Sequence, residues 1–155
     1  PASASAYNTF IKALLLGDVD AMNTYINRVA SATFSYFDTG KNPSGEAEPE
    51  RFYHSFVLGL LVELSDKYRI TSNRESGFGR YDVMLEPLGP SEDAVSIEFK
   101  VCSARKKQTL EDAAAEALDQ IDRMRYAADL EAKGIPSERI RKYGFAFDGK
   151  KVLIG

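Results

Sequence analysis

The sequence predicts an α/β fold in which a mixed β-sheet lies between helices. Apart from one polar loop, residues 7–66 carry apolar side chains at helical spacing. Residues 71–101 hold strand-like runs around a turn at Gly89-Pro90, and a long amphipathic helix then precedes two short strands. The predicted order is therefore helices, three strands, a helix and two strands.

The composition is that of an ordinary globular protein. The 155 residues are 44% hydrophobic and 28% charged, with no apolar run long enough to cross a bilayer. A single cysteine and the lack of a signal-peptide pattern lead us to expect a cytoplasmic protein without membrane contact. The net charge of −3 means that any binding to nucleic acid needs a local basic surface. Because the first residue is proline, we expect a processed chain or, more readily, a fragment of a larger protein.

The N-terminal residues predict a pair of helices. Apolar spacing over residues 7–16 ends at Gly17, and Asp18 can cap a second helix that continues to about Val29. A polar loop follows over residues 38–48. We expect residues 1–48 to form an extra helical pair and loop packed on a core of residues 49–155, within one compact domain.

Two further helices are expected on either side of the central strands. Residues 49–66 are apolar nearly all round, which predicts a largely buried helix. Residues 108–133 read as one long alanine-rich helix ended by Gly134-Ile135-Pro136. Strands at residues 142–147 and 151–154, joined by an Asp148-Gly149 turn, complete the sheet.

The central hairpin carries the most informative polar residues. Val95, Ile97 and Phe99 alternate with Ser96, Glu98 and Lys100, so the apolar set faces a core and the polar set shares the other face. If the hairpin is centred near Pro90, Asp82 pairs with Glu98 on that polar face; a long turn or a bulge would shift the register. We expect Asp82, Ser96, Glu98 and Lys100 to line an accessible concave surface.

Asp82 followed by Glu98-Phe99-Lys100 and an amphipathic helix resembles the PD-(D/E)xK nuclease superfamily. Four further segments are similar to the nuclease-like domain found C-terminal to AAA-ATPase-like domains: Tyr53-His54, SNRESGFGRYD at residues 72–82, Gln120-Ile121 and YGFAF at residues 143–147. This similarity runs from about Tyr7 to the end of the chain. Tyr81 replaces the proline of the superfamily's name, a common variation that leaves the carboxylate in place.

The resemblance implies a restriction-endonuclease-like core and a Mg²⁺-dependent nuclease, with Mn²⁺ as a substitute, that acts on DNA more readily than on RNA. Asp82 and Glu98 are hard oxygen ligands suited to Mg²⁺, and the Phe99 carbonyl could complete the set. Lys100 would orient the attacking water or stabilise developing charge. An upstream AAA-ATPase-like domain is the expected partner.

Other site residues have competing interpretations. His54 resembles an additional metal ligand, or is a buried histidine bonded to backbone. Glu75 joins the carboxylates from the loop between strands, or pairs with Arg74 or Arg80. Gln120 reaches the site or faces solvent, and Met124 stands where related nucleases often have a tyrosine.

We also expect a basic surface that contacts nucleic acid. The candidates for phosphate contact are Arg74, Arg80, Arg105, Lys106 and Lys107. The run at residues 105–107 could instead cap a sheet edge in solvent. Cys102 lacks the partners of a nucleophilic thiol, so we place it in the core.

Two alternatives to an enzyme remain open at the level of sequence. The first is a nuclease fold kept for nucleic-acid or partner binding without efficient turnover, which the lack of overall basic charge favours. The second is a docking domain that uses the N-terminal helical pair. The presence of Asp82, Glu98 and Lys100 together favours the enzyme, because a binding module has little need of all three.

Overall fold

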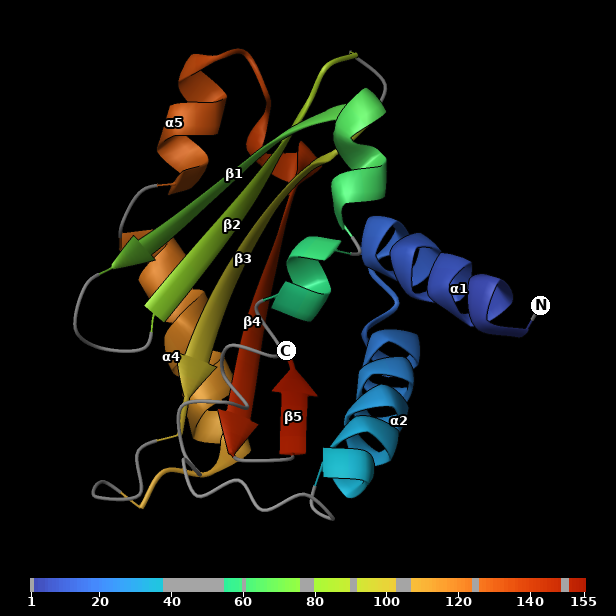
Figure 1. Cartoon of the computed structure of the whole chain (residues 1–155). Helices are drawn as coiled ribbons and strands as arrows, with labels where there is room; N and C mark the ends of the chain where they lie inside the picture. Colours follow the sequence, from blue (N-terminus) through green and yellow to red (C-terminus); the bar gives the residue numbers. More distant parts are fainter. Residues whose placement is uncertain are drawn as a thin grey trace.

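A computed structural model describes residues 2–37, 55–59, 61–75, 80–89, 92–102, 107–123, 126–148 and 151–155. Its centre is a five-stranded mixed sheet in the order β1-β2-β3-β4-β5 (Figure 1). The strands are β1 (Tyr68–Glu75), β2 (Arg80–Pro87), β3 (Ala94–Val101), β4 (Ile140–Asp148) and β5 (Lys151–Ile154). Only β3 and β4 run parallel; the other neighbouring pairs are antiparallel. The predicted mixed sheet and the predicted succession of strands along the chain are confirmed.

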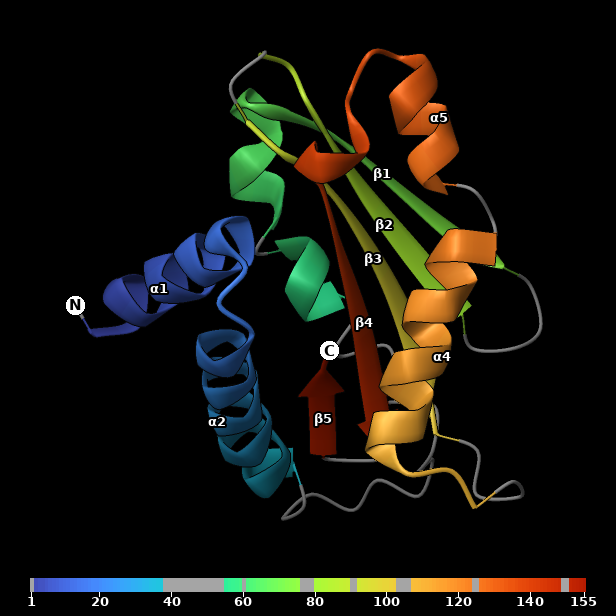
Figure 2. The ribbon, with the colours of Figure 1, turned by 180° about the vertical axis from the view of Figure 1, so that it is seen from behind.

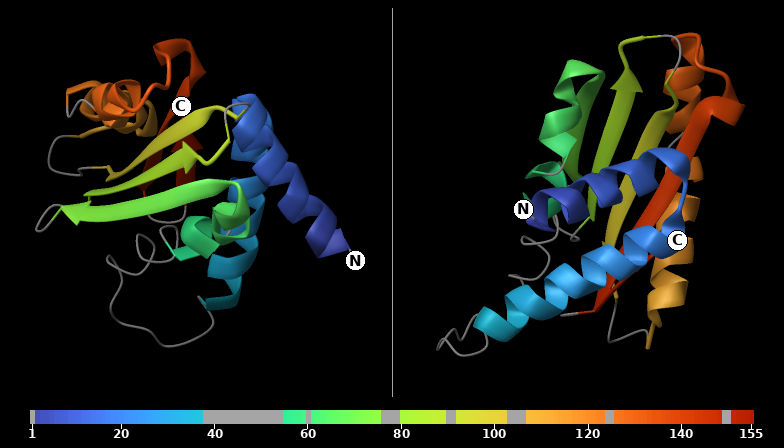
Figure 3. Two further views of the ribbon diagram at one scale, coloured as in Figure 1. Left: turned by 90° about the horizontal axis from the view of Figure 1, so that it is seen from above. Right: turned by 90° about the vertical axis from the view of Figure 1, so that its right-hand side faces the viewer.

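Helices cover both faces of the sheet (Figures 1 and 3). One face carries α1 (Ala2–Leu16), α2 (Val19–Phe37), helical residues 55–59 and 61–62, and the 3₁₀ turn η1 (Glu63–Asp66). The other carries α4 (Leu110–Arg123) and α5 (Tyr126–Ala132), as the view from behind shows (Figure 2). A second 3₁₀ turn, η2 (Ser137–Arg139), leads from α5 into β4. Within these ranges, no helix is both long and apolar enough to cross a membrane.

The larger core lies between the sheet and the N-terminal helices. Val95, Ile97 and Phe99 are completely buried there, as the alternation in β3 predicts. Phe10, Leu14, Met22 and Ile26 fill the same cluster from α1 and α2, and Val57, Leu61 and Leu64 fill it from residues 55–66. The N-terminal helices therefore contribute directly to the core that supports the central strand.

The boundary between α1 and α2 follows the predicted signals. Gly17 has a φ of 79°, a conformation that glycine adopts without steric cost. The Asp18 carboxylate accepts a hydrogen bond of 3.1 Å from the Ala21 amide and so caps α2. At its other end α1 begins at Ala2, earlier than the apolar spacing alone indicates.

Two asparagines of α2 bind the outer edge of β5. The Asn23 amide exchanges hydrogen bonds of 2.9 and 2.8 Å with the backbone carbonyl and N–H of Ile154. Asn27 makes the same pair of contacts with Val152, at 2.9 and 3.3 Å. Four helical residues rise about 6 Å and two strand residues slightly more, so the two spacings match. Side-chain amides thus take the place of a sixth strand at this edge.

Small residues bring α4 close to β4. Ala113, Ala114 and Ala117 are buried on α4 and face the strand's Gly144 and Ala146. A Cβ built on Gly144 would lie 2.5 Å from the Ala114 carbonyl oxygen, closer than real contacts allow. The absence of a side chain at Gly144 therefore sets the spacing between helix and sheet.

One predicted helix is wrong in extent. The expected helix over residues 108–133 is two helices, α4 and α5, that point in different directions (Figure 2). Leu130 of α5 is buried against Ala94 and Ile140, out of phase with the alanine stripe of α4, so one straight helix could not bury both.

The helix expected over residues 49–66 ends in the tighter 3₁₀ turn η1, and residues 49–54 and 60 lie outside the described ranges. Its apolar residues are not all inside. Val57, Leu61 and Leu64 are buried, whereas Val62 is 62% exposed. The spacing of the buried three gives this segment one core face rather than full burial.

The close approach at Gly144 can be tested by Gly144→Ala. The added methyl collides with helix backbone, and overpacking of this kind costs roughly 1–3 kcal/mol, so a lower free energy of unfolding by urea is expected. Gly59→Ala is the matched control, because a Cβ there meets nothing within 4 Å and alanine favours a helix. Equal effects of the two substitutions would contradict the packing argument.

Candidate active site

The register of β2 and β3 brings the two predicted carboxylates together. Asp82 is the direct cross-strand partner of Glu98, with no bulge in the pairing between them. Partners in an antiparallel pair share a face and have Cβ atoms about 4.5–5.5 Å apart. The predicted pairing of Asp82 with Glu98 is therefore confirmed. Lys100 follows Glu98 by two residues and leaves β3 on the same face.

This polar face is buried, whereas we expected it to be accessible. Asp82 is 6% exposed, Ser96 1% and Glu98 3%. Within the described ranges these three are the buried polar or charged residues, and all lie on the face of β2 and β3 that α4 and α5 cover. The prediction of an open concave surface is therefore wrong; over β3, where Ser96 and Glu98 lie, the close packing of α4 accounts for the burial. Burial of two carboxylates is costly unless other groups compensate their charge.

Lys100 contacts a carboxylate that the sequence analysis did not select. Its ammonium forms an ion pair with Glu116 of α4; the Lys100 side chain is 14% exposed and that of Glu116 30%. The other oxygen of the Glu116 carboxylate accepts a hydrogen bond from the Gln108 amide. Glu116 could have been identified from the sequence, because it lies four residues before Gln120 and residues four apart share one side of a helix.

Gln120 is half-buried on α4, one turn beyond Glu116. The crossover between parallel strands makes α4 run antiparallel to β3. The helical turn from Glu116 to Gln120 rises about as far as two strand residues, and two strand residues separate Lys100 from Glu98. The helix edge that holds Glu116 beside Lys100 is therefore the edge on which Gln120 lies.

Several candidate residues have only their backbone described, or none of their structure. Glu75 is the last residue of β1, paired with Arg80 of β2, and not in the connecting loop where we expected it. Arg74, also in β1, pairs with Tyr81. The side chains of these residues, and all of His54, Arg105 and Lys106, lie outside the described parts of the chain.

Lys107 is exposed beyond the end of β3 and has a positive φ of 51°. The Phe99 side chain is fully buried in the core on the opposite face, where it packs against Phe145 with ring centroids 5.0 Å apart. That contact fixes the strand between the two site residues that flank it, Glu98 and Lys100.

Cys102 is part of the packing beside the site. It is half-buried next to the small-residue cluster of α4 and β4, and its Sγ lies 3.5 Å from the Thr109 carbonyl oxygen. Burial raises the pKa of its thiol, and the carboxylates of Asp148, Asp112 and Glu111 raise it further, while Lys100 lowers it. The thiol therefore stays protonated near neutral pH, in keeping with the predicted packing role.

The charges of the site suit a divalent cation. Among the described side chains of the site, Asp82, Glu98 and Glu116 are three carboxylates and Lys100 supplies one ammonium, a formal excess of two negative charges. Hard carboxylate oxygens are the ligands that Mg²⁺ prefers, and Mg²⁺ commonly uses only one or two of them because it keeps several waters. Within the described ranges, no cluster of three His, Cys, Asp or Glu residues is placed to hold a metal. A metal here would use the Asp82–Glu98 pair.

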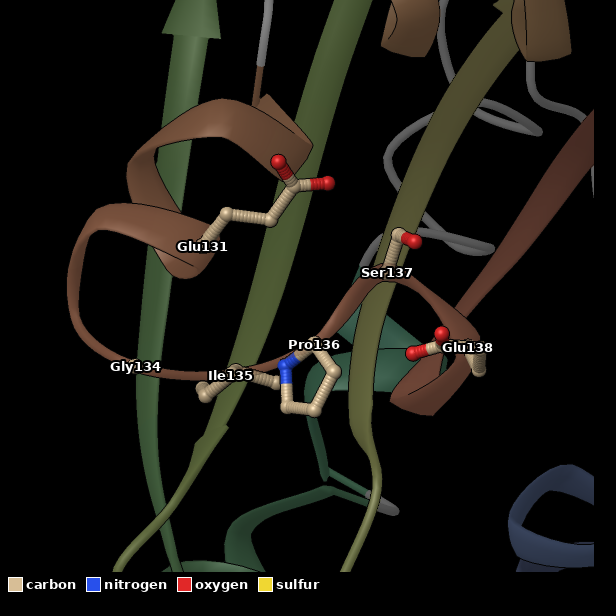
Figure 4. Close-up of a pocket in the computed structure, with 6 residues that line it drawn as sticks. All are labelled: Glu131, Gly134, Ile135, Pro136, Ser137 and Glu138. Carbon is tan, nitrogen blue, oxygen red and sulfur yellow. The ribbon is translucent and has the colours of Figure 1, made fainter.

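A surface hollow elsewhere on the molecule does not belong to this site. It is lined by Glu131, Gly134, Ile135, Pro136, Ser137 and Glu138 (Figure 4). These residues precede β4, whose first residue pairs with Ala94 at the start of β3, whereas Glu98 and Lys100 lie toward the end of β3. Both charged residues of the lining are acidic, which disfavours a phosphate group.

Comparison with known proteins agrees with this geometry. A family model described as PD-(D/E)XK nuclease superfamily matches residues 48–155, more than half of the chain. Searches of curated proteins and of solved structures gave no significant match. The mixed five-stranded sheet with helices on both faces is the restriction-endonuclease-like α/β fold that the sequence predicts. The chain belongs to the PD-(D/E)XK nuclease superfamily.

Proposed function

We propose that this protein is a Mg²⁺-dependent nuclease that cleaves DNA phosphodiester bonds in an active site formed by Asp82, Glu98 and Lys100. One observation carries the proposal: the cross-strand pair Asp82–Glu98 is buried on the same sheet face as Lys100. A fold gains no stability from two adjacent buried carboxylates unless a cation or hydrogen bonds compensate them. Membership of a nuclease superfamily supplies the reaction class.

Asp82 and Glu98 would hold the metal, with the Phe99 carbonyl as a third protein ligand. Bound there, a divalent cation supplies charge neutralisation on the phosphate and a more acidic water. The role of the carboxylate pair is to fix its position on a rigid sheet rather than on a loop. Mn²⁺, which also accepts oxygen ligands, should substitute.

Lys100 would act on the phosphate and on the attacking water. Phosphodiester hydrolysis builds negative charge on the phosphoryl oxygens, and a fixed ammonium beside them stabilises the transition state more than the ground state. Gln120, on the helix edge that also carries Glu116, would donate a hydrogen bond to the same water or phosphate.

The remaining predicted site residues would surround this centre and contact the metal or the DNA. His54 and Glu75 are candidate additional metal ligands, and Arg74, Arg80, Arg105, Lys106 and Lys107 are candidate contacts for the DNA backbone. The narrower resemblance to domains found after AAA-ATPase-like domains supports an ATPase portion as the partner in a longer protein. The comparisons bear on the superfamily, so this partner remains a prediction.

The burial of the site favours one alternative, a nuclease-fold module that binds nucleic acid or protein without efficient turnover. Asp82 and Glu98 are 6% and 3% exposed, which leaves little of either carboxylate open to a metal-bound phosphate. A module has no need of that access. Single-turnover cleavage assays distinguish the two possibilities, because a module binds its ligand and leaves it intact.

The metal site predicts a thermal shift with Mg²⁺ or Mn²⁺. A cation that binds only the folded protein, and is present at roughly one hundred times its dissociation constant, raises the free energy of unfolding by about 2.7 kcal/mol. Asp82→Asn and Glu98→Gln preserve side-chain volume and should each abolish most of the rise in melting temperature. Asp119→Asn, at an exposed position of α4, should retain it. A wild-type protein with no shift at millimolar metal would contradict the site.

Loss of the ammonium should affect chemistry more than binding. Lys100→Ala is expected to leave the metal shift and most DNA affinity in place while lowering single-turnover cleavage by roughly a hundredfold or more. Lys12→Ala, at an exposed position of α1, is the control for loss of a positive charge. Both single- and double-stranded DNA are tested with each metal. Equal rates for wild type and Lys100→Ala would assign any activity to other residues or to a contaminant.

A further inference from the structure

We propose that Glu116 is the positioning residue for Lys100: its carboxylate holds the ammonium on the α4 side of the site, away from the two carboxylates that bind metal. This inference rests on the proposed function, because it names the residue through which the catalytic lysine would be oriented. Its structural part, the restraint on Lys100, can be measured without catalysis.

The Glu116 carboxylate makes two contacts, one with each oxygen. Oε1 of Glu116 contacts Nζ of Lys100, and Oε2 accepts from Nε2 of Gln108. A carboxylate engaged at both oxygens cannot rotate without loss of one contact. The direction in which Glu116 presents its charge to Lys100 is therefore fixed by Gln108.

The residues that hold Glu116 in place belong to a rigid part of the fold. Thr109, next to Gln108, caps α4: its hydroxyl accepts from the Asp112 amide at 3.1 Å, and the Asp112 carboxylate accepts from the Thr109 amide at 3.2 Å. Further along, Gly144 lets the helix backbone approach the sheet, and it is the cross-strand neighbour of Glu98. The start of α4 and its distance from the carboxylates are both set by local contacts.

Lys100 needs this restraint because its side chain is long and flexible. A lysine ammonium is a compact charge on a flexible four-carbon stem. Lys100 is 14% exposed and lies two residues from Glu98 on the same face, alongside the carboxylates of the proposed metal site. Without Glu116, the ammonium would pair with Glu98 or Asp82 and compete with the cation.

Glu116 acts through Lys100 in this arrangement and not as a third metal ligand. The described residues contain no group of three carboxylate, histidine or cysteine side chains close enough to hold an ion. A residue that works through Lys100 has a distinctive signature, since its removal matters only while Lys100 is present.

The test is a double-mutant cycle in single-turnover cleavage of DNA. Glu116→Gln keeps the size and removes the charge, and should lower the cleavage rate roughly 10- to 100-fold, the usual effect of losing a group that orients an active-site residue. In the Lys100→Ala background the same change should have no further effect. Glu116→Asp keeps the charge and should recover part of the rate. Glu111→Gln, exposed on the same helix, should leave the rate unchanged.

The metal-induced rise in melting temperature provides a second measurement for the same double-mutant cycle. Glu116→Gln should weaken the Mn²⁺-induced rise in melting temperature when Lys100 is present, and should leave that rise unaltered in Lys100→Ala. Equal losses in both backgrounds, by either measurement, would show that Glu116 acts independently of Lys100 and would overturn the inference. Faster cleavage by Glu116→Gln would also overturn it.

The restraint itself is measured by NMR of ¹⁵N-lysine-labelled protein without metal or DNA. The Lys100 ammonium signal, assigned by its loss in Lys100→Arg, should be protected from solvent exchange in wild type and lose that protection in Glu116→Gln. Unchanged protection would overturn the positioning role whether or not the protein cleaves DNA. Absence of wild-type cleavage alongside loss of protection would instead refute the proposed nuclease activity and leave the restraint standing.

Discussion

The close packing of α4 on β4 is the constraint on which the site depends. Alanines on the helix and Gly144 on the strand remove the side-chain layer that normally separates a helix from a sheet. Because β3 and β4 are parallel, the connection between them must cross over this face, and α4 is that connection. The helix therefore arrives directly above Glu98 and Lys100 and brings Glu116 with it.

The two faces of the sheet differ: one packs against the apolar core and the other carries the candidate site. The face toward α1 and α2 is filled by large apolar residues, including Phe99, Phe145 and Phe147, and provides most of the buried hydrophobic surface. The opposite face carries small residues and the buried polar groups Asp82, Ser96 and Glu98. A strong apolar layer behind β3 allows the front of the same strand to retain charges that destabilise the fold.

Local pattern was enough to predict the strands, their order and the Asp82–Glu98 register, because alternation in β3 specifies which residues share a face. The contact between Lys100 and Glu116 was not predictable in this way, since it depends on the separation of a helix from a sheet. The burial of Glu98 was missed for the same reason. The division into α4 and α5 was missed because no glycine or proline marks it in the sequence, while Leu130 packs against a different part of the sheet.

The asparagine pair of α2 has a consequence for how the nuclease region can be delimited. The family match begins at residue 48, whereas Asn23 and Asn27, which complete the edge of β5, come earlier. A protein trimmed to the matched segment would lose these amides and the apolar residues of α1 and α2. It would present an open strand edge next to uncovered core, a combination that promotes edge-to-edge aggregation. Insolubility of such a fragment would report on the missing helices and say nothing about the site.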